Sequence, residues 1–278
     1  MTDNERLALA VEIAREAGEM IREARAAQTF GHRYKQGHEL VTDVDVAVDT
    51  HITARLEGAF PEEARLSEEL APERHLLEEK AALWVVDPID GTVNFAHGFH
   101  HVAVSIAWAQ AGRVTLGVVH APFLGETFTA LAGQGAHCNG QPIQASRTRS
   151  LERCLVGTGF PYRRDSRPPL MRRLGAVLEH CQDVRRNGSA ALDLCDVACG
   201  RLDAYYESVS PWDFAAGWLI AREAGARTGH LYPCPEDTGT NTVSPPQSSA
   251  TSSYSTSSCL TLSMFALGLS ILLIATII

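Results

Sequence analysis

The stretch that decides the fold runs over Trp84–Phe95 and reads WVVDPIDGTVNF. It begins inside an apolar run, 83–86, which is typical of a buried strand that stops at Asp87. Asp90 follows, and Gly91-Thr92 comes next, where the sequence predicts that a helix begins. Carboxylates at such a turn can hold a cation, while backbone N–H groups at the helix start can receive an anion.

Aspartate before Pro or Gly is also a common turn signal, so turn formation or helix capping stays open as the alternative for these two aspartates alone. Two further acidic positions are Glu68, in a glutamate pair after the second predicted helix, and Asp213, at another helix start. Each alone is ordinary, because glutamate pairs are usually solvated and a first-turn Asp complements the helix dipole. Together, carboxylates at strand ends and helix starts favour magnesium over zinc, and cations held there would attract a phosphate ester.

The residue pattern predicts two unlike halves. Residues 1–145 are predicted to be α+β, with helices over 5–27 and 45–58 followed by an antiparallel meander. Residues 146–237 alternate strands with helices and are predicted to be α/β. The predicted strands cover 83–86, 101–109, 114–120, 126–132, 154–157, 184–185, 202–206 and 227–232, and the later helices cover 169–181, 189–199 and 212–224.

Composition argues against several classes of protein. The chain has 278 residues and a formal net charge of -9, whereas nucleic-acid binding rests on clustered Lys and Arg, so no nucleic-acid partner is expected. Its seven cysteines lack the paired spacing of a zinc ribbon or a disulfide framework, which predicts a reducing compartment. The polar start, 1–6, does not resemble a secretory signal. These features predict a cytoplasmic protein.

The chain changes character after Asp237, because positions 238–278 contain no Lys, Arg, Asp or Glu. The Ser/Thr-rich segment 238–259 is predicted to be a disordered linker. The apolar run 260–278 would extend roughly 28 Å as a helix, which is close to the thickness of a bilayer core. Three interpretations stay open: a membrane anchor, the removable tail of a lipid-anchor signal, and a sequence altered after Asp237.

From about residue 5 to residue 237, the chain resembles the lithium-sensitive, magnesium-dependent inositol monophosphatases. The most specific motifs are WVVDPIDGTVNF (84–95) and PWDFAAGWLIAREAG (211–225). Supporting motifs are LVTDVD (40–45), GQGAHCNG (133–140), RRNGSAALDL (185–194) and DAYYE (203–207). The resemblance implies a layered α-β-α-β-α sandwich, of the type shared with fructose bisphosphatases, and a homodimer.

The resemblance also implies the site residues. Two to three Mg²⁺ ions would be bound by Glu68, Asp87, the Ile89 carbonyl, Asp90 and Asp213. The catalytic residues would be Glu68 and Thr92, which orient the attacking water, and Asp90. The substrate would meet Asp90, Gly91, Thr92, Arg185, Gly188, Ser189, Ala190, Glu207 and Asp213. Residues acting through water or from a mobile loop near the metals would be Asp43, Asp45 and Lys35.

The implied reaction is magnesium-dependent hydrolysis of a small polyol phosphate, myo-inositol monophosphate, by in-line attack of water without a phosphoenzyme. Histidinol phosphate, fructose bisphosphate and nucleotide bisphosphate are the alternative substrates within the superfamily. A non-catalytic phosphatase-like protein, which binds a partner or is tethered to a membrane by 260–278, is the alternative of another class. The sequence departs from the family at Ser67 and Ala226, where glycine is usual. The family's terminal strand and helix are replaced by the uncharged tail, which predicts an incomplete sheet edge.

Overall fold

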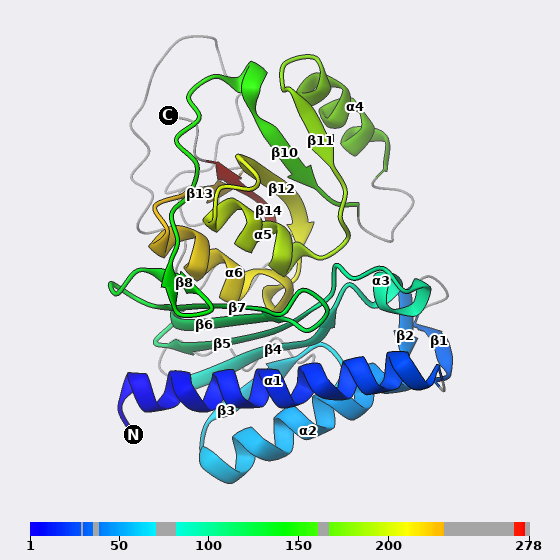
Figure 1. The fold of residues 1–278 in the computed structure, drawn as a ribbon, viewed down its shortest axis with the longest axis vertical. Coiled ribbons are helices and arrows are strands. Elements are labelled where there is room, and N and C mark those ends of the chain that lie inside the picture. Colours follow the sequence, from blue (N-terminus) through cyan, green and yellow to red (C-terminus); the bar gives the residue numbers. More distant parts are fainter. Residues whose placement is uncertain (29, 36–38, 71–81, 161–166, 231–269, 276–278) are drawn as a thin grey trace, which may run out of the picture.

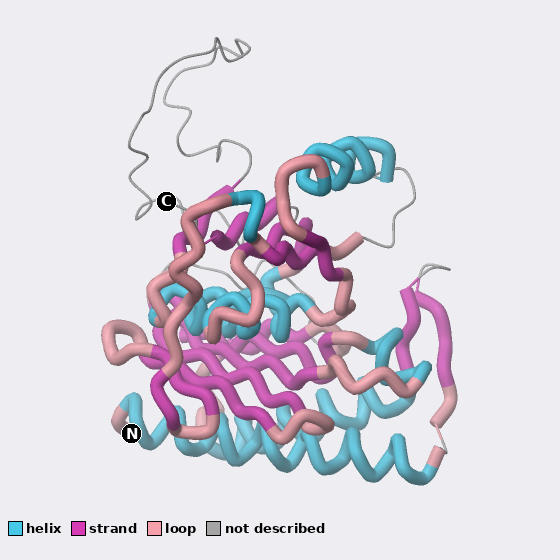
Figure 2. Tube along the Cα trace, turned by 45° about the horizontal axis from the view of Figure 1, so that its top comes forward, coloured by secondary structure: helices cyan, strands magenta, loops and turns pink. Residues whose placement is uncertain are grey.

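Helices and sheets alternate in five layers in the computed structural model of this chain, which describes residues 1–28, 30–35, 39–70, 82–160, 167–230 and 270–275. Two helices cover the outer face of a seven-stranded sheet, two more lie on its inner face, and a five-stranded sheet with one outer helix follows (Figure 1). Figure 2 shows the inner helices between the strands of the two sheets. The arrangement confirms the α-β-α-β-α sandwich predicted from the sequence.

The outer helical layer consists of α1 (Asp3–Ala27) and α2 (Asp43–Ala59). Between them in the chain lies a two-stranded hairpin of β1 (His32–Lys35) and β2 (Glu39–Thr42). Each helix starts with a capping box, in which a threonine hydroxyl and an acidic side chain satisfy the first backbone N–H groups. In α2 the acidic residue is Asp45, so the cap places a buried carboxylate at the end of the helix nearest the site described below.

The seven-stranded sheet has the order β3-β4-β5-β6-β7-β8-β9. Only β3 and β4 are parallel, and the remaining neighbours are antiparallel, which confirms the predicted meander. The strands are β3 (Ala64–Ser67), β4 (Ala82–Asp90), β5 (Ala103–Gln110), β6 (Arg113–Ala121), β7 (Glu126–Leu131), β8 (Ala136–Cys138) and β9 (Gln141–Pro142).

Strand β4 is longer than the sequence predicted. It continues past Asp87 to Asp90, and its pairing with β5 shifts register between these two residues. Proline has no N–H to donate to a ladder, so Pro88 suits this irregular step, and pairing resumes with Asp90 opposite Ala103. The prediction that the strand stops at Asp87 is wrong. Helix α3 (Thr92–His97) begins at the predicted place.

The second half alternates strands and helices, as predicted. Its five-stranded sheet has the order β11-β10-β12-β14-β13, in which β10 is parallel to both neighbours and β14 is antiparallel to both. The strands are β10 (Leu155–Thr158), β11 (Asp183–Arg185), β12 (Ala204–Val209), β13 (Arg227–His230) and β14 (Ser270–Ala275). The helices are α4 (Arg167–Leu178), α5 (Ala190–Ala198) and α6 (Pro211–Glu223), and a short 3₁₀ helix covers Leu151–Arg153.

Strand β14 lies inside the apolar run for which a membrane anchor was one of three open interpretations. Ser270–Ala275 is a strand inserted between β12 and β13, so this segment does not form the helix of that interpretation, and the prediction of an incomplete sheet edge is wrong. Periodicity alone does not separate a continuous apolar strand from a helix. The linker 238–259 and the rest of 260–278 lie outside the described residues. Within the described ranges, no helix combines the length and apolar character needed to cross a membrane.

Among the residues that the structure describes, three apolar clusters fill the spaces between the layers. Ile13 of α1 and Trp84 of β4 belong to the cluster under the outer helices. Leu194 of α5 belongs to the largest cluster, which joins the inner helices to both sheets. Val156 of β10 packs with Val177 of α4 in the smallest cluster, beneath the outer helix of the second half. The inner helices are therefore held on both faces, which fixes the positions of their first turns.

Gly117 of β6 allows α6 to lie directly on the seven-stranded sheet. A Cβ atom on Gly117 would lie 2.8 Å from the carbonyl oxygen of Ala216, which is a backbone atom and cannot rotate away as the end of a side chain can. We expect Gly117→Ala to lower the free energy of unfolding by about 1–3 kcal/mol, as overpacking does in other cores. Urea denaturation measures the change. The matched control is Gly58→Ala in α2, where no atom crowds the added methyl group, so unchanged or higher stability is expected.

Candidate metal centre

Three aspartates from distant parts of the chain meet at one point. Asp87 and Asp90 lie at the end of β4, and Asp213 lies in the first turn of α6. One carboxylate oxygen from each lies within 4.8 Å of the others, and Asp87 and Asp90 are buried. The structure thus brings together three of the predicted metal ligands.

Burial and mutual repulsion oppose ionisation of these carboxyl groups. Burial, followed by the charges of Glu68, Asp90 and Asp213, raises the pKa of Asp87 well above its ordinary value. Burial, followed by the charge of Asp90, does the same to the pKa of Asp213. Burial raises the pKa of Asp90 to about 6, although hydrogen bonds from the start of α5 act in the opposite direction. Cations would replace the protons that such a cluster retains.

Glu68 follows directly after β3 and lies beside β4. Its backbone N–H donates to the Val86 carbonyl at 3.3 Å, and its charge contributes to the raised pKa of Asp87. Asp49 of α2 holds this turn, because its carboxylate accepts hydrogen bonds from the Ser67 hydroxyl and from the two backbone N–H groups after Glu68. Ser67, which departs from the family pattern, therefore anchors the turn that presents Glu68.

The Thr92 hydroxyl, at the first position of α3, lies between two acceptors. It is 2.9 Å from Asp45 Oδ1 and 3.1 Å from the Ile89 carbonyl oxygen. Asp45 is buried and also accepts the Thr42 backbone N–H at 2.8 Å, and burial raises the pKa of its carboxyl group. One hydroxyl carries one proton, so Thr92 donates to one oxygen at a time. The predicted residues Thr92, Ile89 and Asp45 are thus in mutual contact beside the cluster.

Asp90 connects β4 to the inner helical layer. Its Oδ2 atom accepts a hydrogen bond from Ser189 Oγ at 2.6 Å and another from the Ala191 N–H at 2.6 Å, and the Ala190 backbone adds a further interaction. The positive end of the α5 dipole favours a negative carboxylate at this place. The predicted substrate residues Ser189 and Ala190 therefore lie at the cluster, where the first turn of α5 meets Asp90.

Two glycines let the backbones of the two halves approach each other. Gly91 has φ +98° and Gly188 has φ +91°, a region that disfavours other residues. A Cβ atom on Gly91 would lie 2.9 Å from the His101 carbonyl oxygen and 3.3 Å from that of Gly188. The Asn94 side chain spans the same junction by donating to the carbonyls of His101 and Asn187, both at 2.8 Å. The predicted residues Gly91 and Gly188 are thus adjacent.

Glu207 lies on β12, in the second half of the chain, and its carboxylate interacts electrostatically with Asp90 and Asp213. Its carboxylate accepts a hydrogen bond from the Tyr205 hydroxyl. Burial raises the pKa of Glu207 to about 7, and the charges of Asp193 and Asp90 add to this rise. The charge of Glu207 in turn contributes to the raised pKa of Asp213. The structure therefore places this predicted substrate residue within electrostatic reach of the aspartates.

Arg185 does not join the cluster. Its guanidinium is paired with Asp183 at 2.5 Å and also donates to the Val184 carbonyl, on the edge strand β11. The next residue, Arg186, is the one beside the site, since its Nη1 atom lies 2.7 Å from the position that a Cβ on Gly188 would occupy. The charge of Arg186 also lowers the pKa of Glu207. A pair of adjacent arginines did not reveal which one faces inward.

Of two other predicted positions, one lies away from the cluster and the other has a side chain outside the described residues. Asp43 is exposed in the first turn of α2, and the backbone N–H of Gly31 donates to its carboxylate at 3.2 Å. Lys35 ends β1, and its side chain lies outside the described residues.

The sequence analysis missed a second group beside the centre. His101 Nε2 lies 3.4 Å from Asp193 Oδ1, and Asp196 completes a cluster of three side chains. Burial alone would lower the pKa of His101, but the charges of Asp193 and Asp196 outweigh burial and raise it. The Asn187 amide also donates to Asp193 at 2.7 Å. We interpret this group as an ion pair that fixes the His101 segment, and no sequence motif marked it.

The donors at the aspartate cluster are oxygen atoms, with Glu68 and the Ile89 carbonyl close by. Hard oxygen ligands suit Mg²⁺, whereas zinc sites are usually built with Cys or His. Bound divalent cations would also offset the cost of ionising three carboxyl groups at one point, two of which are buried. The residues present therefore fit a magnesium site.

The sequence profile of the inositol monophosphatase family matches residues 3–258, which covers both halves and their junction. The chain belongs to the inositol monophosphatase family. Among curated members, "Nus factor SuhB" of Salmonella typhimurium (strain 14028s / SGSC 2262) is 39% identical over 234 residues, covering 81% of this chain and 87% of the relative. "Nus factor SuhB" of Pseudomonas aeruginosa is 41% identical over 224 residues, covering 79% and 83%.

Solved structures of the inositol monophosphatase family show the same fold. The inositol monophosphatase from Anabaena has 34% identity and a TM-score of 0.71, covering 82% of this chain and 84% of its own. The extragenic suppressor protein suhB from Bartonella henselae has 33% identity and a TM-score of 0.74, covering 81% and 87%. A Staphylococcus aureus member, SaIMPase-II with bound inositol monophosphate, has 26% identity and a TM-score of 0.72, covering 96% and 87%.

The inositol monophosphatase family consists of metal-dependent phosphatases. The cluster of Asp87, Asp90 and Asp213 in this chain could hold the metal ion that such phosphatases need. The name of the Nus factor relatives does not describe ester hydrolysis. These relatives also give no support to the prediction that the chain lacks a nucleic-acid partner. Lithium sensitivity, a homodimer and a cytoplasmic location stay predictions.

Proposed function

We propose that the chain hydrolyses the phosphate monoester of a small polyol, myo-inositol monophosphate, in the presence of Mg²⁺. The observation that carries the proposal is the convergence of Asp87, Asp90 and Asp213 within 4.8 Å. Without cations, this cluster would repel a phosphate ester and would cost folding free energy, because its carboxyl groups are buried and resist ionisation. Bound divalent cations would offset this free-energy cost, which supports a metal-binding role for the cluster.

The proposed ligands are Glu68, Asp87, the Ile89 carbonyl, Asp90 and Asp213, for two to three ions. When bound, such ions supply Lewis-acid activation of water and stabilise the charge on the leaving oxygen. The acidic side chains contribute by holding fixed positions in both halves of the chain.

Thr92 and Glu68 are proposed to orient the attacking water. Thr92 is fixed by Asp45 and by the Ile89 carbonyl, so its hydroxyl oxygen keeps a constant position and can accept a hydrogen bond from water. Glu68 is fixed through the Asp49 anchor of its turn. Positioning of this kind accounts for a large part of the rate enhancement in phosphoryl transfer.

The polyol is proposed to lie between Glu207 and the first turn of α5, with its phosphate toward Gly91 and Thr92. The positive φ of Gly91 and the close approach of Gly188 remove side-chain bulk from this junction. Glu207 accepts or donates hydrogen bonds to hydroxyl groups near neutral pH, since its pKa is about 7. Arg186 replaces Arg185 as the proposed cationic neighbour of the substrate.

The direct test is phosphate release by the full chain from a panel of monoesters at millimolar magnesium. The panel includes myo-inositol monophosphate, histidinol phosphate, fructose bisphosphate and 2'-AMP, since SaIMPase-II structures hold inositol monophosphate and 2'AMP. Turnover of the inositol ester that disappears on magnesium removal supports the proposal. Absence of metal-dependent turnover with every ester would contradict the proposal and favour the non-catalytic alternative.

Arg186→Ala is expected to raise KM for the polyol ester about tenfold while changing kcat little, because it removes a charge-assisted hydrogen bond to the substrate. The matched control is Arg185→Ala, which removes an equal charge from a residue already paired with Asp183, so its KM stays within about twofold. Steady-state kinetics of both variants decides the assignment. A larger KM effect at Arg185 than at Arg186 would reverse it.

The division at residue 237 into a phosphatase domain, a linker and a tail is retained as a proposal with one change. β14 belongs to the five-stranded sheet, so the proposed domain includes 270–275. Homodimer formation is proposed on the family resemblance.

A further inference from the structure

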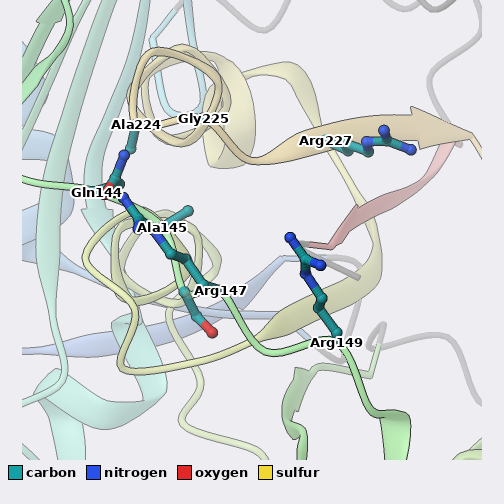
Figure 3. A pocket seen from close by; sticks show the side chains of 8 residues that line it. Gln144, Ala145, Arg147, Arg149, Ala224, Gly225 and Arg227 are labelled. Atoms are coloured by element: carbon teal, nitrogen blue, oxygen red, sulfur yellow. Dashed lines mark hydrogen bonds between the residues drawn. The ribbon is translucent and has the colours of Figure 1, made fainter. Parts of the chain in front are cut away.

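We propose a second binding site, for a small multiply charged phosphate anion, in a pocket lined by Arg147, Arg149 and Arg227 (Figure 3). The pocket lies between the segment that follows β9 and the turn from α6 to β13. Figure 3 shows Arg149 and Arg227 on one side of it, with Gln144 and Ala145 opposite.

The walls of the pocket are held in place by the backbone. Ala145 donates its N–H to the Ala224 carbonyl at 3.0 Å, which fastens the segment after β9 to the end of α6. Gly225 turns the chain with φ +94°, so that β13 starts immediately with Arg227. Arg147 is held from the other side, because it donates to the Gln144 side chain at 3.0 Å. A pocket with fixed walls needs little reorganisation to receive a ligand.

The charge of the pocket is unusual for this chain. In a molecule with net charge -9, three exposed arginines gather here, and the pocket lining includes no carboxylate. Several other arginines of the described ranges are paired with carboxylates, such as Arg6 with Glu63 at 2.7 Å and Arg201 with Asp196 at 3.2 Å. By contrast, no ion pair joins Arg147, Arg149 or Arg227 to an acidic group in the part of the chain that the structure describes.

The acidic residue next to the pocket in sequence is already engaged. Glu223, at the end of α6, accepts the N–H groups of Gly133 and Gly135, both at 2.9 Å. Three guanidinium groups without a carboxylate repel one another, and an anion with several charges would relieve this repulsion. Planar guanidinium groups also match phosphate oxygens in a bidentate geometry, which favours a phosphate ligand.

The size of the pocket limits the ligand. Its volume of about 210 Å³ is smaller than the ~300–1,000 Å³ of clefts that hold drug-sized molecules. A diphosphate group fits this limit. A nucleic-acid strand would need a longer basic track than three arginines in an acidic protein provide.

The pocket is separate from the candidate metal centre. Asp213 lies in the first turn of α6, whereas Ala224 and Gly225 lie beyond its last turn. A helix of 13 residues is roughly 20 Å long, so an ion in the pocket does not touch the aspartate cluster. The proposal therefore stands independently of the proposed hydrolysis.

In the test, metal-free protein is titrated with diphosphate. Binding is measured by calorimetry and by the change in melting temperature. Metal removal leaves the aspartate cluster acidic, so that it repels the probe. We expect one diphosphate per chain and a higher melting temperature. Arg149→Ala and Arg227→Ala are each expected to weaken binding at least fivefold without loss of folding, because both side chains are exposed. The matched control, Arg113→Ala at an exposed position of β6, keeps wild-type affinity.

Three results would overturn the proposal. The first is no diphosphate binding at millimolar concentration. The second is binding that Arg149→Ala and Arg227→Ala leave unchanged. The third is a single-stranded RNA that displaces diphosphate, binds more tightly and loses affinity in the same two variants, which would identify a nucleic-acid surface instead.

Discussion

Asp87→Asn is expected to lower kcat/KM more than 100-fold and, in metal-free protein, to raise the melting temperature. Substitutions one step removed from a metal already cost about 10–100-fold, so loss of a proposed ligand should cost more. The amide preserves the acceptor for the Ile89 N–H, at 3.0 Å, and removes a carboxyl group whose ionisation the charges of Glu68, Asp90 and Asp213 oppose. Each kcal/mol gained would raise the melting temperature by about 2–4 °C in a domain of this size.

The control for this prediction is Asp43→Asn, which makes the same chemical change at an exposed position outside the cluster. Its activity should remain within about twofold of the wild type, as for most exposed substitutions. Magnesium should stabilise the wild type and the Asp43 variant but stabilise the Asp87 variant less. Wild-type turnover in Asp87→Asn, or a lower melting temperature without metal, would contradict the assignment.

Metal-free protein is expected to lose stability as the pH rises from about 4 to above 6. The pKa values of Asp87, Asp90 and Asp213 are raised in the folded chain, that of Asp90 to about 6, so the folded state holds more protons than the unfolded state across this window. The contribution is complete below the unfolded pKa of about 4 and is lost as the pH passes the folded values. Each retained proton changes the unfolding equilibrium roughly tenfold per pH unit.

Urea denaturation at several pH values, with and without magnesium, measures this dependence. Magnesium binds the ionised carboxylates, so the stabilisation that it gives should grow with pH over the same window. His101 adds a loss of the same sign at higher pH, since its pKa is also raised. Asp87→Asn should flatten the metal-free profile across this window, because the pKa of Asp87 is raised well above its ordinary value. A profile that rises with pH without metal in the wild type would show that the cluster is ionised at no cost.

The two unlike halves and the acidic positions could be predicted from local patterns, whereas the five layers came from the family resemblance. The turn at Gly91 and the first turn of α6 marked where helices begin, but the apolar run before Asp87 placed the end of β4 too early. Carboxylates placed at such ends converge when a sheet packs on helices, as Asp87, Asp90 and Asp213 do. The family resemblance added Glu207 and Ser189, which come from elements that periodicity could locate but not orient.

The errors arose where side-chain orientation or the pairing of distant segments decides the structure. Adjacent arginines share one local pattern, which did not show that Arg185 pairs with Asp183 while Arg186 lies beside Gly188. The buried Asp49 lies on α2, where no sequence motif marked it. Its role became visible only in the hydrogen bond that it accepts from the Ser67 hydroxyl. The apolar segment at Ser270–Ala275 pairs with β12 and β13, and sequence hydropathy did not separate this strand from a membrane helix.

The start of α5 donates hydrogen bonds to Asp90 and therefore competes with any cation for the carboxylate of this residue. The Oδ2 atom that Ser189 and Ala191 already occupy has fewer lone pairs left for an ion, so the strength of that contact sets how tightly an ion is kept. Cation affinity can thus be tuned by residues that never touch a cation. A lineage that changes only the first turn of α5 would shift its working magnesium concentration while all its acidic ligands stay the same.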